Sequence, residues 1–284
     1  MKPYAEVIGD PIAQSKSPAI HNFWLGRLGI DAEYRACNVQ ADELADYLAA
    51  RRTDLAWRGC NVTMPHKQAV IPLLYNVEPL AEAIGAVNTV YPAFDRSLTG
   101  TNTDAAGFLE PLSGTLGKTH LFRMARIFGT GGAARAIITA LASQGFTLVL
   151  AGRDPGKARA LLDELAPEGE HHAIDLAHFA EPTDFPFDDR ESCLDLVVNA
   201  SSLGMQGQPL LAFDWSHAPP RSIAYDIVTA PHETHFLQAA RDQGLHTIDG
   251  LSMLIGQAAI AFEVFFGQPA PREHDDELRR ILTA

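Results

Sequence analysis

The chain has 284 residues, of which 46% are hydrophobic and 20% charged; this suits a globular protein with a large core and one or two domains. Its formal net charge is −13 and it has no basic run, which argues against nucleic acid and anionic membranes as partners. Cys37, Cys60 and Cys193 are widely spaced, so we expect three buried thiols and neither a disulfide framework nor a zinc site.

The first residues carry no export signal, and no run of 18 apolar residues occurs elsewhere, so we expect a cytoplasmic protein. Residues 4–9 form the first predicted strand, and Pro18 suits the first turn of a helix that ends at Leu28. Ser17 is the natural N-cap of this helix. Two interpretations of Ser15 and Ser17 are equally open: they cap and turn the chain, or they hold a carboxylate beside the helix N-terminus.

A second predicted strand spans residues 34–39, and an amphipathic helix spans residues 41–50. A short strand then ends at residues 61–63, and Pro65 opens a helix that carries Lys67. A cation in a first helical turn opposes the helix dipole, so a functional role for Lys67 needs independent support. We expect His66 to lie at the surface or to cap the helix.

The segment 84–91 leads into a further strand, and residues 98–104 form a short return strand that ends in a polar turn. Asp104 is suited to cap a helix over residues 105–112, and a chemical role for its carboxylate is equally open. Because strands alternate with helices from residue 4 to residue 104, this part of the chain is predicted to be a small α/β domain.

Residues 126–154 read as a strand, a glycine turn, a helix and a second strand. Gly129, Gly131, Gly132 and Ala133 form a GxGGA pattern, in which glycines let the backbone approach a pyrophosphate and the amides at the next helix N-terminus hold the anion. Since a strand precedes the pattern and a helix follows it, we interpret this stretch as a dinucleotide-binding unit.

The second strand of this unit ends at Arg153, where an NAD-binding fold usually places an acidic residue. We interpret Arg153 and Lys157 as a clamp for the 2′-phosphate of NADP. The alternatives are a solvated loop of mixed charge and a ribose contact through Asp154, so NAD also stays possible.

The remaining chain continues a doubly wound sheet domain. Its predicted elements are a helix over 158–165, an irregular segment over 173–189, strands over 194–199 and 223–228 and a helix over 234–243. Residues 250–267 form a strongly apolar helix, which is predicted to be buried, so that Gln257 needs a polar partner.

A dinucleotide domain beside a second α/β domain with polar residues at its strand ends suggests a dehydrogenase. A lysine paired with an aspartate can give or take the hydroxyl proton during hydride transfer, because the carboxylate orients and charges the ammonium. The sequence separation of Lys67 and Asp104 does not show whether they meet.

The motifs of this chain resemble those of the shikimate dehydrogenase family. They run in family order from residue 9 to residue 267: GDPIAQSKSPAIHN, NVTMPHK, GAVNT, GTNTD, GTGGAARA, NASSLGM and GLSMLIGQAA. The resemblance implies Lys67 and Asp104 as the catalytic pair. It implies that the substrate is bound by Ser15, Ser17, Thr63, Asn88 and Gln257, and it extends the cofactor-binding set to Asn199 and Gly250.

The family fold implied has an N-terminal α/β substrate domain, residues 1–104, completed by C-terminal helices in residues 246–284. A Rossmann-type, doubly wound parallel-sheet domain for NADP, residues 105–245, is inserted between them. The reaction implied is the reversible NADPH-dependent reduction of 3-dehydroshikimate to shikimate, without a metal, in aromatic amino-acid biosynthesis. The expected partner is this small-molecule substrate, with no nucleic acid or membrane, and the expected assembly is a monomer or homodimer.

Two departures from the family pattern bear on specificity. The usual NRT after the second cofactor strand is GRD at residues 152–154, which places a carboxylate near the expected phosphate. The usual DxxYxPxxT is DIVTAPHET, so Thr229 stands where a tyrosine is common. A dehydrogenase for quinate or a related cyclohexane carboxylate is therefore an alternative. A non-catalytic dinucleotide sensor is a second alternative, although a sensor would be free to lose the Lys67 and Asp104 pair.

Overall fold

The computed structural model describes residues 1–189 and 192–284, and the chain divides into two compact units. The first unit comprises residues 1–107 and 255–284, and the second comprises residues 108–254. The unit boundaries fall within helices α5 (Asp104–Leu109) and α10 (Gly250–Phe266). The boundaries predicted from the sequence motifs lie after residues 104 and 245.

The first unit contains a six-stranded mixed sheet with the order β2-β1-β3-β5-β6-β4. Its strands are β1 (Tyr4–Gly9), β2 (Glu33–Asn38), β3 (Trp57–Val62), β4 (Asn76–Val77), β5 (Thr89–Pro92) and β6 (Leu98–Thr101). Strand β5 runs antiparallel to both β3 and β6, whereas β1 pairs in parallel with β2 and β3. The other elements are α1 (Ser17–Leu28), α2 (Leu44–Thr53), α3 (His66–Ala69), η1 (Ile71–Leu73), α4 (Pro79–Ile84), η5 (Arg272–His274) and α11 (Asp275–Thr283), besides α5 and α10.

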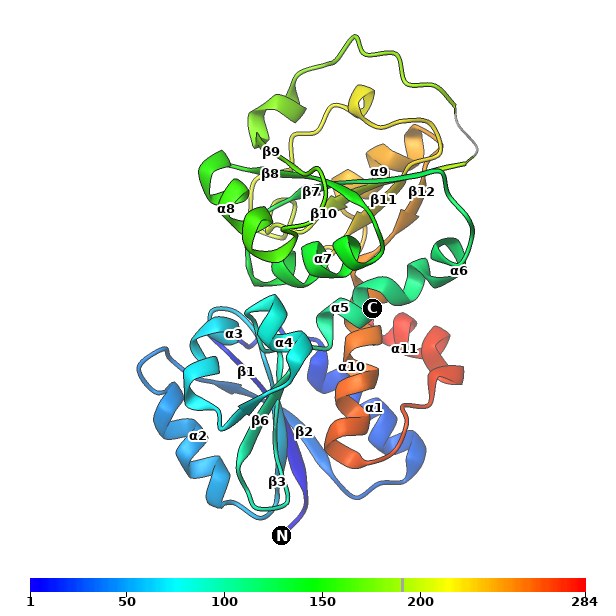
Figure 1. Cartoon of the computed structure of the whole chain (residues 1–284). Helices are drawn as coiled ribbons and strands as arrows, with labels where there is room; N and C mark the ends of the chain where they lie inside the picture. The colour runs from blue at the N-terminus through cyan, green and yellow to red at the C-terminus, as the bar shows by residue number, and fades with distance from the viewer. Residues whose placement is uncertain (190–191) are drawn as a thin grey trace. The chain divides into compact units, whose positions relative to one another are not determined.

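Strand β1 is buried along its whole length, which is typical of a parallel strand covered on both faces. Figure 1 shows α2 on one side of the first sheet and α1 and α10 on the other. Tyr4 and Ile8 belong to the core cluster on the α2 side. Ala5 and Val7 belong to a second cluster that includes Phe265 of α10. Helix α10, from the last part of the chain, therefore completes the core of a domain that begins at residue 1.

The second unit contains a fully parallel sheet with the order β12-β11-β10-β7-β8-β9, which is the doubly wound order of a Rossmann-type domain. Its strands are β7 (Phe122–Phe128), β8 (Thr147–Gly152), β9 (His172–Asp175), β10 (Cys193–Asn199), β11 (Ile223–Asp226) and β12 (His246–Ile248). The other elements are η2 (Glu110–Leu112), α6 (Ser113–Leu116), α7 (Gly132–Ser143), α8 (Pro155–Leu165), η3 (Leu176–Ala180), η4 (Trp215–His217) and α9 (His235–Asp242). The predicted fold class is confirmed.

Three local expectations are wrong, and one strand lies where no element is predicted. The segment predicted as irregular begins with strand β9 and helix η3, and β12 was not predicted at all. Only Cys60 is a buried thiol, whereas Cys37 and Cys193 are half-buried. Helix α1 begins at Ser17 itself and Lys16 is its N-cap residue. Ser17 therefore does not cap the helix, and the Ser15 hydroxyl accepts a bond from the Ser17 amide at 3.3 Å.

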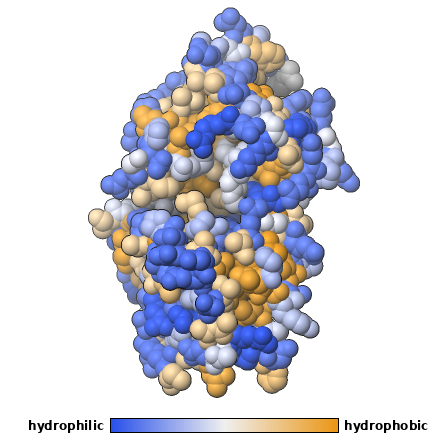
Figure 2. Space-filling view, turned by 90° about the vertical axis from the view of Figure 1, so that its left-hand side faces the viewer, coloured by the Kyte–Doolittle hydropathy of each residue, from blue (hydrophilic) through white to orange (hydrophobic). Residues whose placement is uncertain are grey.

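The surface mixes hydrophilic residues with smaller hydrophobic patches on the face that Figure 2 shows. Within the described ranges, no helix is both long enough and apolar enough to cross a bilayer.

Candidate active site

Lys67 and Asp104 form an ion pair in the first unit. The Lys67 Nζ donates to the Asp104 Oδ2 over 2.6 Å, and their side chains are 15% and 7% exposed. Such a pair is short, charge-assisted and partly shielded from water, and therefore stronger than an exposed one. Because an ammonium has three N–H donors, Lys67 can bind Asp104 and still direct a proton toward a second acceptor.

The backbone of Lys67 is fixed from two directions. Helix α3, which follows the end of β3, has only four residues and carries Lys67 at its second position. The Lys67 carbonyl accepts the Val87 amide at 2.8 Å, which joins α3 to the segment before β5. His66 is fully buried and its Nε2 donates to the Val39 carbonyl at 2.7 Å. The expectation of a surface or capping histidine is therefore wrong, since His66 anchors the helix that carries Lys67.

The Asp104 carboxylate is free for Lys67 because another residue caps α5. The Asn102 Oδ1 accepts the backbone amides of Asp104 and Ala105 at 3.0 and 3.4 Å. Asp104 is the first residue of the helix rather than its cap. The capping interpretation of Asp104 is therefore wrong, and a chemical role for its carboxylate stays a prediction.

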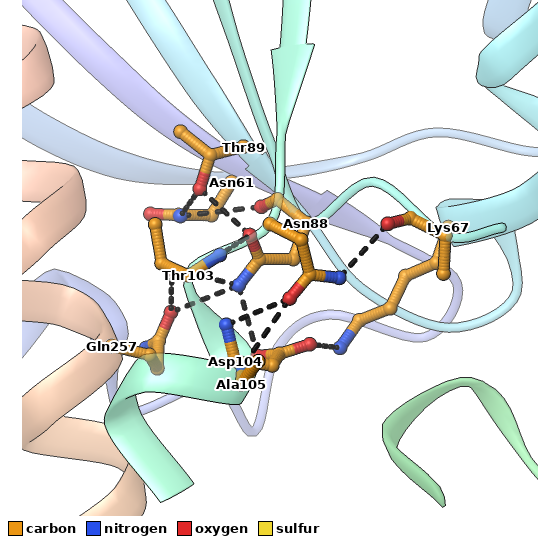
Figure 3. Close-up of polar contacts among 10 residues, drawn as sticks. Asn61, Lys67, Asn88, Thr89, Thr103, Asp104, Ala105 and Gln257 are labelled. Atoms are coloured by element: carbon orange, nitrogen blue, oxygen red, sulfur yellow. Dashed lines mark hydrogen bonds and ion pairs between the residues drawn. The ribbon is translucent and has the colours of Figure 1, made fainter. Parts of the chain in front are cut away.

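Asn88 joins the pair to a buried group of polar side chains (Figure 3). Its Nδ2 donates to the Asp104 Oδ1 and the Thr103 Oγ1, both at 2.9 Å, and approaches the Gln257 Oε1 at 3.4 Å. Gln257 is 8% exposed and therefore has the polar partner that its burial requires. Gly107 makes this contact possible, because an added Cβ would lie 2.5 Å from the Gln257 amide nitrogen.

The other residues predicted to bind substrate lie in the same unit but outside this hydrogen-bonded group. Thr63 follows β3 and is half-buried beside Gly9, where an added Cβ would meet its methyl group at 2.6 Å. Ser15 is half-buried and Ser17 is 6% exposed. The Lys16 Nζ between them donates to the Leu282 carbonyl in α11 at 2.6 Å. The C-terminal helix therefore holds the serine loop in place.

The glycine turn of the second unit leaves a helix N-terminus open. Gly131 is the N-cap residue of α7, and no described side chain caps this helix. An added Cβ at Gly131 would enter open space, whereas at Gly129, where φ is +118°, it would lie 2.8 Å from the Ala200 carbonyl oxygen. Gly132 and Ala133 form the first turn of α7. Free amides with open space before them are suited to a pyrophosphate, so these residues fit a dinucleotide.

Arg153 and Lys157 are exposed in the loop after β8 and the first turn of α8. Asp154 between them is the N-cap residue of α8, and its Oδ1 accepts the Lys157 amide at 3.1 Å. The acid that replaces the usual threonine thus stabilises a helix, since aspartate is among the best N-cap residues. The two cations are left with their charged ends available for an anion.

Asn199 lies inside a separate hydrogen-bond group. Its amide nitrogen donates to the Leu203 carbonyl and the Asp226 Oδ1, at 2.8 and 3.0 Å, and its oxygen accepts from Ser201. Asp226 also accepts from the Thr234 hydroxyl, which caps α9. Asn199 is fully buried, and it connects the loop after β10 to the last residue of β11.

Gly250 begins α10 where the backbone is closely approached. An added Cβ would lie 2.4 Å from the Val228 carbonyl oxygen. A glycine is needed here to let the helix start against the loop that carries Thr229. Gly250 therefore affects the shape of this loop through its backbone, because it has no side chain.

Sequence reasoning did not single out Asn61, Asn102 or Thr103. Asn102 and Thr103 stand next to Asp104 in the TNTD run, so the concentration of polar residues after a strand was an available signal. Asn61 stands inside strand β3, where a polar residue is most simply explained by a solvent-facing position. Only the pairing of Asn61 with Thr89 across β3 and β5 shows its buried partner.

Two family models match parts of this chain. The model described as "Shikimate dehydrogenase substrate binding domain" matches residues 7–90, and the one described as "Shikimate 5'-dehydrogenase C-terminal domain" matches residues 250–275. A protein named shikimate dehydrogenase (NADP(+)) from Sphingopyxis alaskensis is 50% identical over 284 residues, covering 99% of this chain and 97% of the relative. A second, from Methylobacterium radiotolerans, is 42% identical and covers 99% and 96%.

Two solved structures of dehydrogenases are similar to this chain over nearly its whole length. Shikimate 5-dehydrogenase from Thermus thermophilus, in complex with NADP(H) and shikimate, is 34% identical with a TM-score of 0.80 and covers 99% of both chains. Quinate dehydrogenase from Corynebacterium glutamicum, in complex with NAD, is 32% identical with a TM-score of 0.83 and covers 99% of both chains.

Proposed function

This chain belongs to the shikimate dehydrogenase family, and we propose that it is an NADP-dependent oxidoreductase that reversibly reduces 3-dehydroshikimate to shikimate in the cytoplasm. This reaction belongs to the shikimate pathway of aromatic amino-acid biosynthesis. The observation that supports it most directly is the shielded contact between Lys67 and Asp104, joined by Asn88. A protein that only sensed a dinucleotide would have no need of such a pair.

The residues of the first unit would bind the ring and move the proton. Ser15 and Ser17 would hold the substrate carboxylate, and Thr63, Asn88 and Gln257 would contact the ring hydroxyls. These hydroxyls are both donors and acceptors, as are the side chains assigned to them. The binding of several polar groups at once would fix the ring with its ketone oxygen toward Lys67.

Lys67 would act as general acid during reduction. NADPH, when bound, supplies the hydride. The Lys67 ammonium donates a proton to the ketone oxygen, which becomes the hydroxyl of shikimate, and in the oxidative direction the neutral amine takes that proton back. Asp104 keeps the Lys67 ammonium oriented through the 2.6 Å contact of its Oδ2 with Nζ.

The residues of the second unit would hold the cofactor. The open N-terminus of α7 would bind the pyrophosphate through Gly131, Gly132 and Ala133, and Gly129 gives the turn its shape. Arg153 and Lys157 would bind the 2′-phosphate, since a guanidinium and an ammonium both suit phosphate oxygens. Asn199 and Gly250 would serve the cofactor by shaping the loops around it.

The proposal is tested by initial rates with shikimate and with quinate, each against NADP and NAD. We expect shikimate with NADP to give the highest kcat/KM. A preference for quinate or for NAD would instead indicate the activity of the Corynebacterium glutamicum relative. It would also make Thr229 and Asp154 the residues to examine for specificity. No turnover in any of the four combinations, from protein that binds NADP, would overturn the assignment.

A further inference from the structure

We propose that Thr89 is a positioning residue for the proton-transfer pair, and that it acts by fixing the orientation of the Asn88 amide. The described hydrogen bonds of the Thr89 side chain go to Asn88 and Asn61, and Asn61 in turn accepts from Tyr34. This inference rests on the proposed function, because it assigns Thr89 a role in the same reaction.

The Asn88 side chain must face one way for the pair to be held. Its Oδ1 accepts the Thr89 hydroxyl at 3.0 Å and the Thr103 amide at 2.8 Å. Its Nδ2 is therefore turned toward the Asp104 Oδ1. A rotation of the amide by half a turn would place two oxygens, those of Asn88 and Asp104, against each other. The donors on the Oδ1 side exclude that arrangement.

The hydrogen bonds that lead to Asp104 all donate in the same direction (Figure 3). The Asn61 Nδ2 donates to the Thr89 Oγ1 at 3.0 Å, the Thr89 hydroxyl donates to Asn88, and Asn88 donates to the carboxylate. Because an amide nitrogen can only donate, the Thr89 proton is left to point at Asn88. Chains of this kind polarise each bond in turn and strengthen the last one.

This series of hydrogen bonds begins at Tyr34, whose hydroxyl and ring both have buried partners. The Tyr34 hydroxyl donates to the Asn61 Oδ1 at 2.6 Å. Its ring stacks on His21 with centroids 3.9 Å apart and 2° between the planes. Burial raises the pKa of Tyr34 well above its ordinary range, so the hydroxyl keeps its proton and stays a donor at the pH of any rate measurement.

Water has little access to these residues. Thr89 is 0% exposed, Tyr34 1%, Asn88 2% and Asn61 6%. A lost partner in such a place leaves a buried polar atom unpaired instead of solvated, and the network rearranges to satisfy it. The side-chain amide of Asn88 would then no longer be held in one orientation. The positions of the Asp104 carboxylate and the Lys67 ammonium would vary with it.

The test replaces Thr89 by residues that differ only in what they can donate. Thr89→Val keeps the shape and suits a strand but removes the hydroxyl, whereas Thr89→Ser keeps the hydroxyl. Thr101→Val is the matched control, because Thr101 pairs with Thr89 in the register of β5 and β6 while its hydroxyl donates to Glu78 instead.

We expect Thr89→Val to lower kcat by about tenfold, since misplacing a catalytic group costs up to about 100-fold. Its KM for NADP should stay within about twofold, because the substitution lies in the first unit and the residues proposed to bind the cofactor lie in the second. Thr89→Ser and Thr101→Val should both keep kcat within about twofold. Equal kcat values for Thr89→Val and Thr101→Val, in an enzyme whose natural form is active, would overturn the proposal.

Tyr34→Phe gives a second measurement if Thr89→Val does not fold. It removes the hydroxyl at the start of the hydrogen-bond series, and we expect kcat to fall by about threefold with the KM for NADP unchanged. An unchanged kcat in Tyr34→Phe would then overturn the positioning role. If the natural chain itself fails to oxidise shikimate, the proposed function fails first, so the two failures are distinguishable.

Discussion

Lys67 lies in the first turn of a helix, where a cation opposes the helix dipole, and Asp104 compensates for that position. Helix α3 has four residues, so the opposing field is weak, while the carboxylate lies only 2.6 Å from the ammonium. The residue types could be predicted from the sequence, but their contact could not. It depends on the pairing of β5 with β6, which brings Asn88 to Thr103 and Asp104.

Lys67→Ala should lower kcat by a factor of about 100 or more, which is the usual contribution of a positioned acid or base. The affinity for NADPH should not change, because the substitution lies in the first unit. Steady-state rates and a fluorescence titration with NADPH measure the two quantities. Lys118→Ala, at an exposed lysine of the second unit, is the control and should retain full activity. A kcat near the natural value in Lys67→Ala would exclude the proton-donor role.

Arg153→Ala should raise the KM for NADP much more than the KM for NAD. A lost charge-assisted contact to a phosphate costs about 1.5–3 kcal/mol, or roughly a tenfold to hundredfold loss of affinity. Only NADP carries the 2′-phosphate, so the ratio of the two KM values is the informative quantity. Lys118→Ala again serves as the control for loss of one exposed cation. Equal effects on both cofactors would mean that Arg153 does not contact the 2′-phosphate.

Among the elements, the strand-turn-helix unit around Gly129 could be predicted well and the short strands could not. The glycine turn, the apolar face of α7 and the run of β8 are all local signals. Strands β9 and β12 have four and three residues, and Ile248 of β12 is the one buried residue among them. They exist because they pair with β8 and β11 at the two edges of the second sheet. Such pairing has no local signature in the sequence.

Asp226 makes the stability of the second unit depend on pH. Burial raises the pKa of its carboxyl from 3.8 to about 6, although hydrogen bonds from Thr234, Val228 and Asn199 act in the opposite direction. Between these two pKa values the folded state binds more protons than the unfolded state. The contribution of Asp226 to the free energy of unfolding is therefore fully present below pH 3.8 and is lost as the pH rises through about 6, a loss of about 3 kcal/mol at most.

Asp226→Asn should abolish this part of the pH dependence, because the amide keeps the shape of the carboxyl without its charge. Urea unfolding at several pH values from 4 to 7 measures the free energy of unfolding of both proteins. Their difference should shift in favour of Asp226→Asn as the pH rises. Asp214→Asn is the contrasting control, because hydrogen bonds from Ser216 lower the pKa of that exposed carboxyl. Parallel pH curves for Asp226→Asn and the natural chain would contradict the assignment.

At the scale of the whole molecule, the first unit is assembled from the two ends of the chain. The apolar character of α10 predicted its burial, and only the order of the family motifs indicated that it returns to the N-terminal domain. The amphipathic helix α11 completes the same unit, with Leu278 and Leu282 buried. The contact between the chain ends that matters most to the site joins the Lys16 Nζ to the Leu282 carbonyl, across 266 positions.

Lys16→Met should raise the KM for shikimate about tenfold and leave the KM for NADP unchanged. The substitution keeps an unbranched side chain of nearly the same length but removes the donor that ties the serine loop to the end of α11, where the carbonyls of a helix favour a cation. A hydrogen bond from a charged group is worth about 1.5–3 kcal/mol. Without it, part of the binding free energy of the substrate is needed to order Ser15 and Ser17. Lys16→Arg, which restores a donor, should recover most of the affinity. Lys2→Met, which removes a surface pair with Asp31, should have no effect. A rise in the KM for NADP of the same size would show instead that Lys16 affects both units, and the loop would not be its point of action.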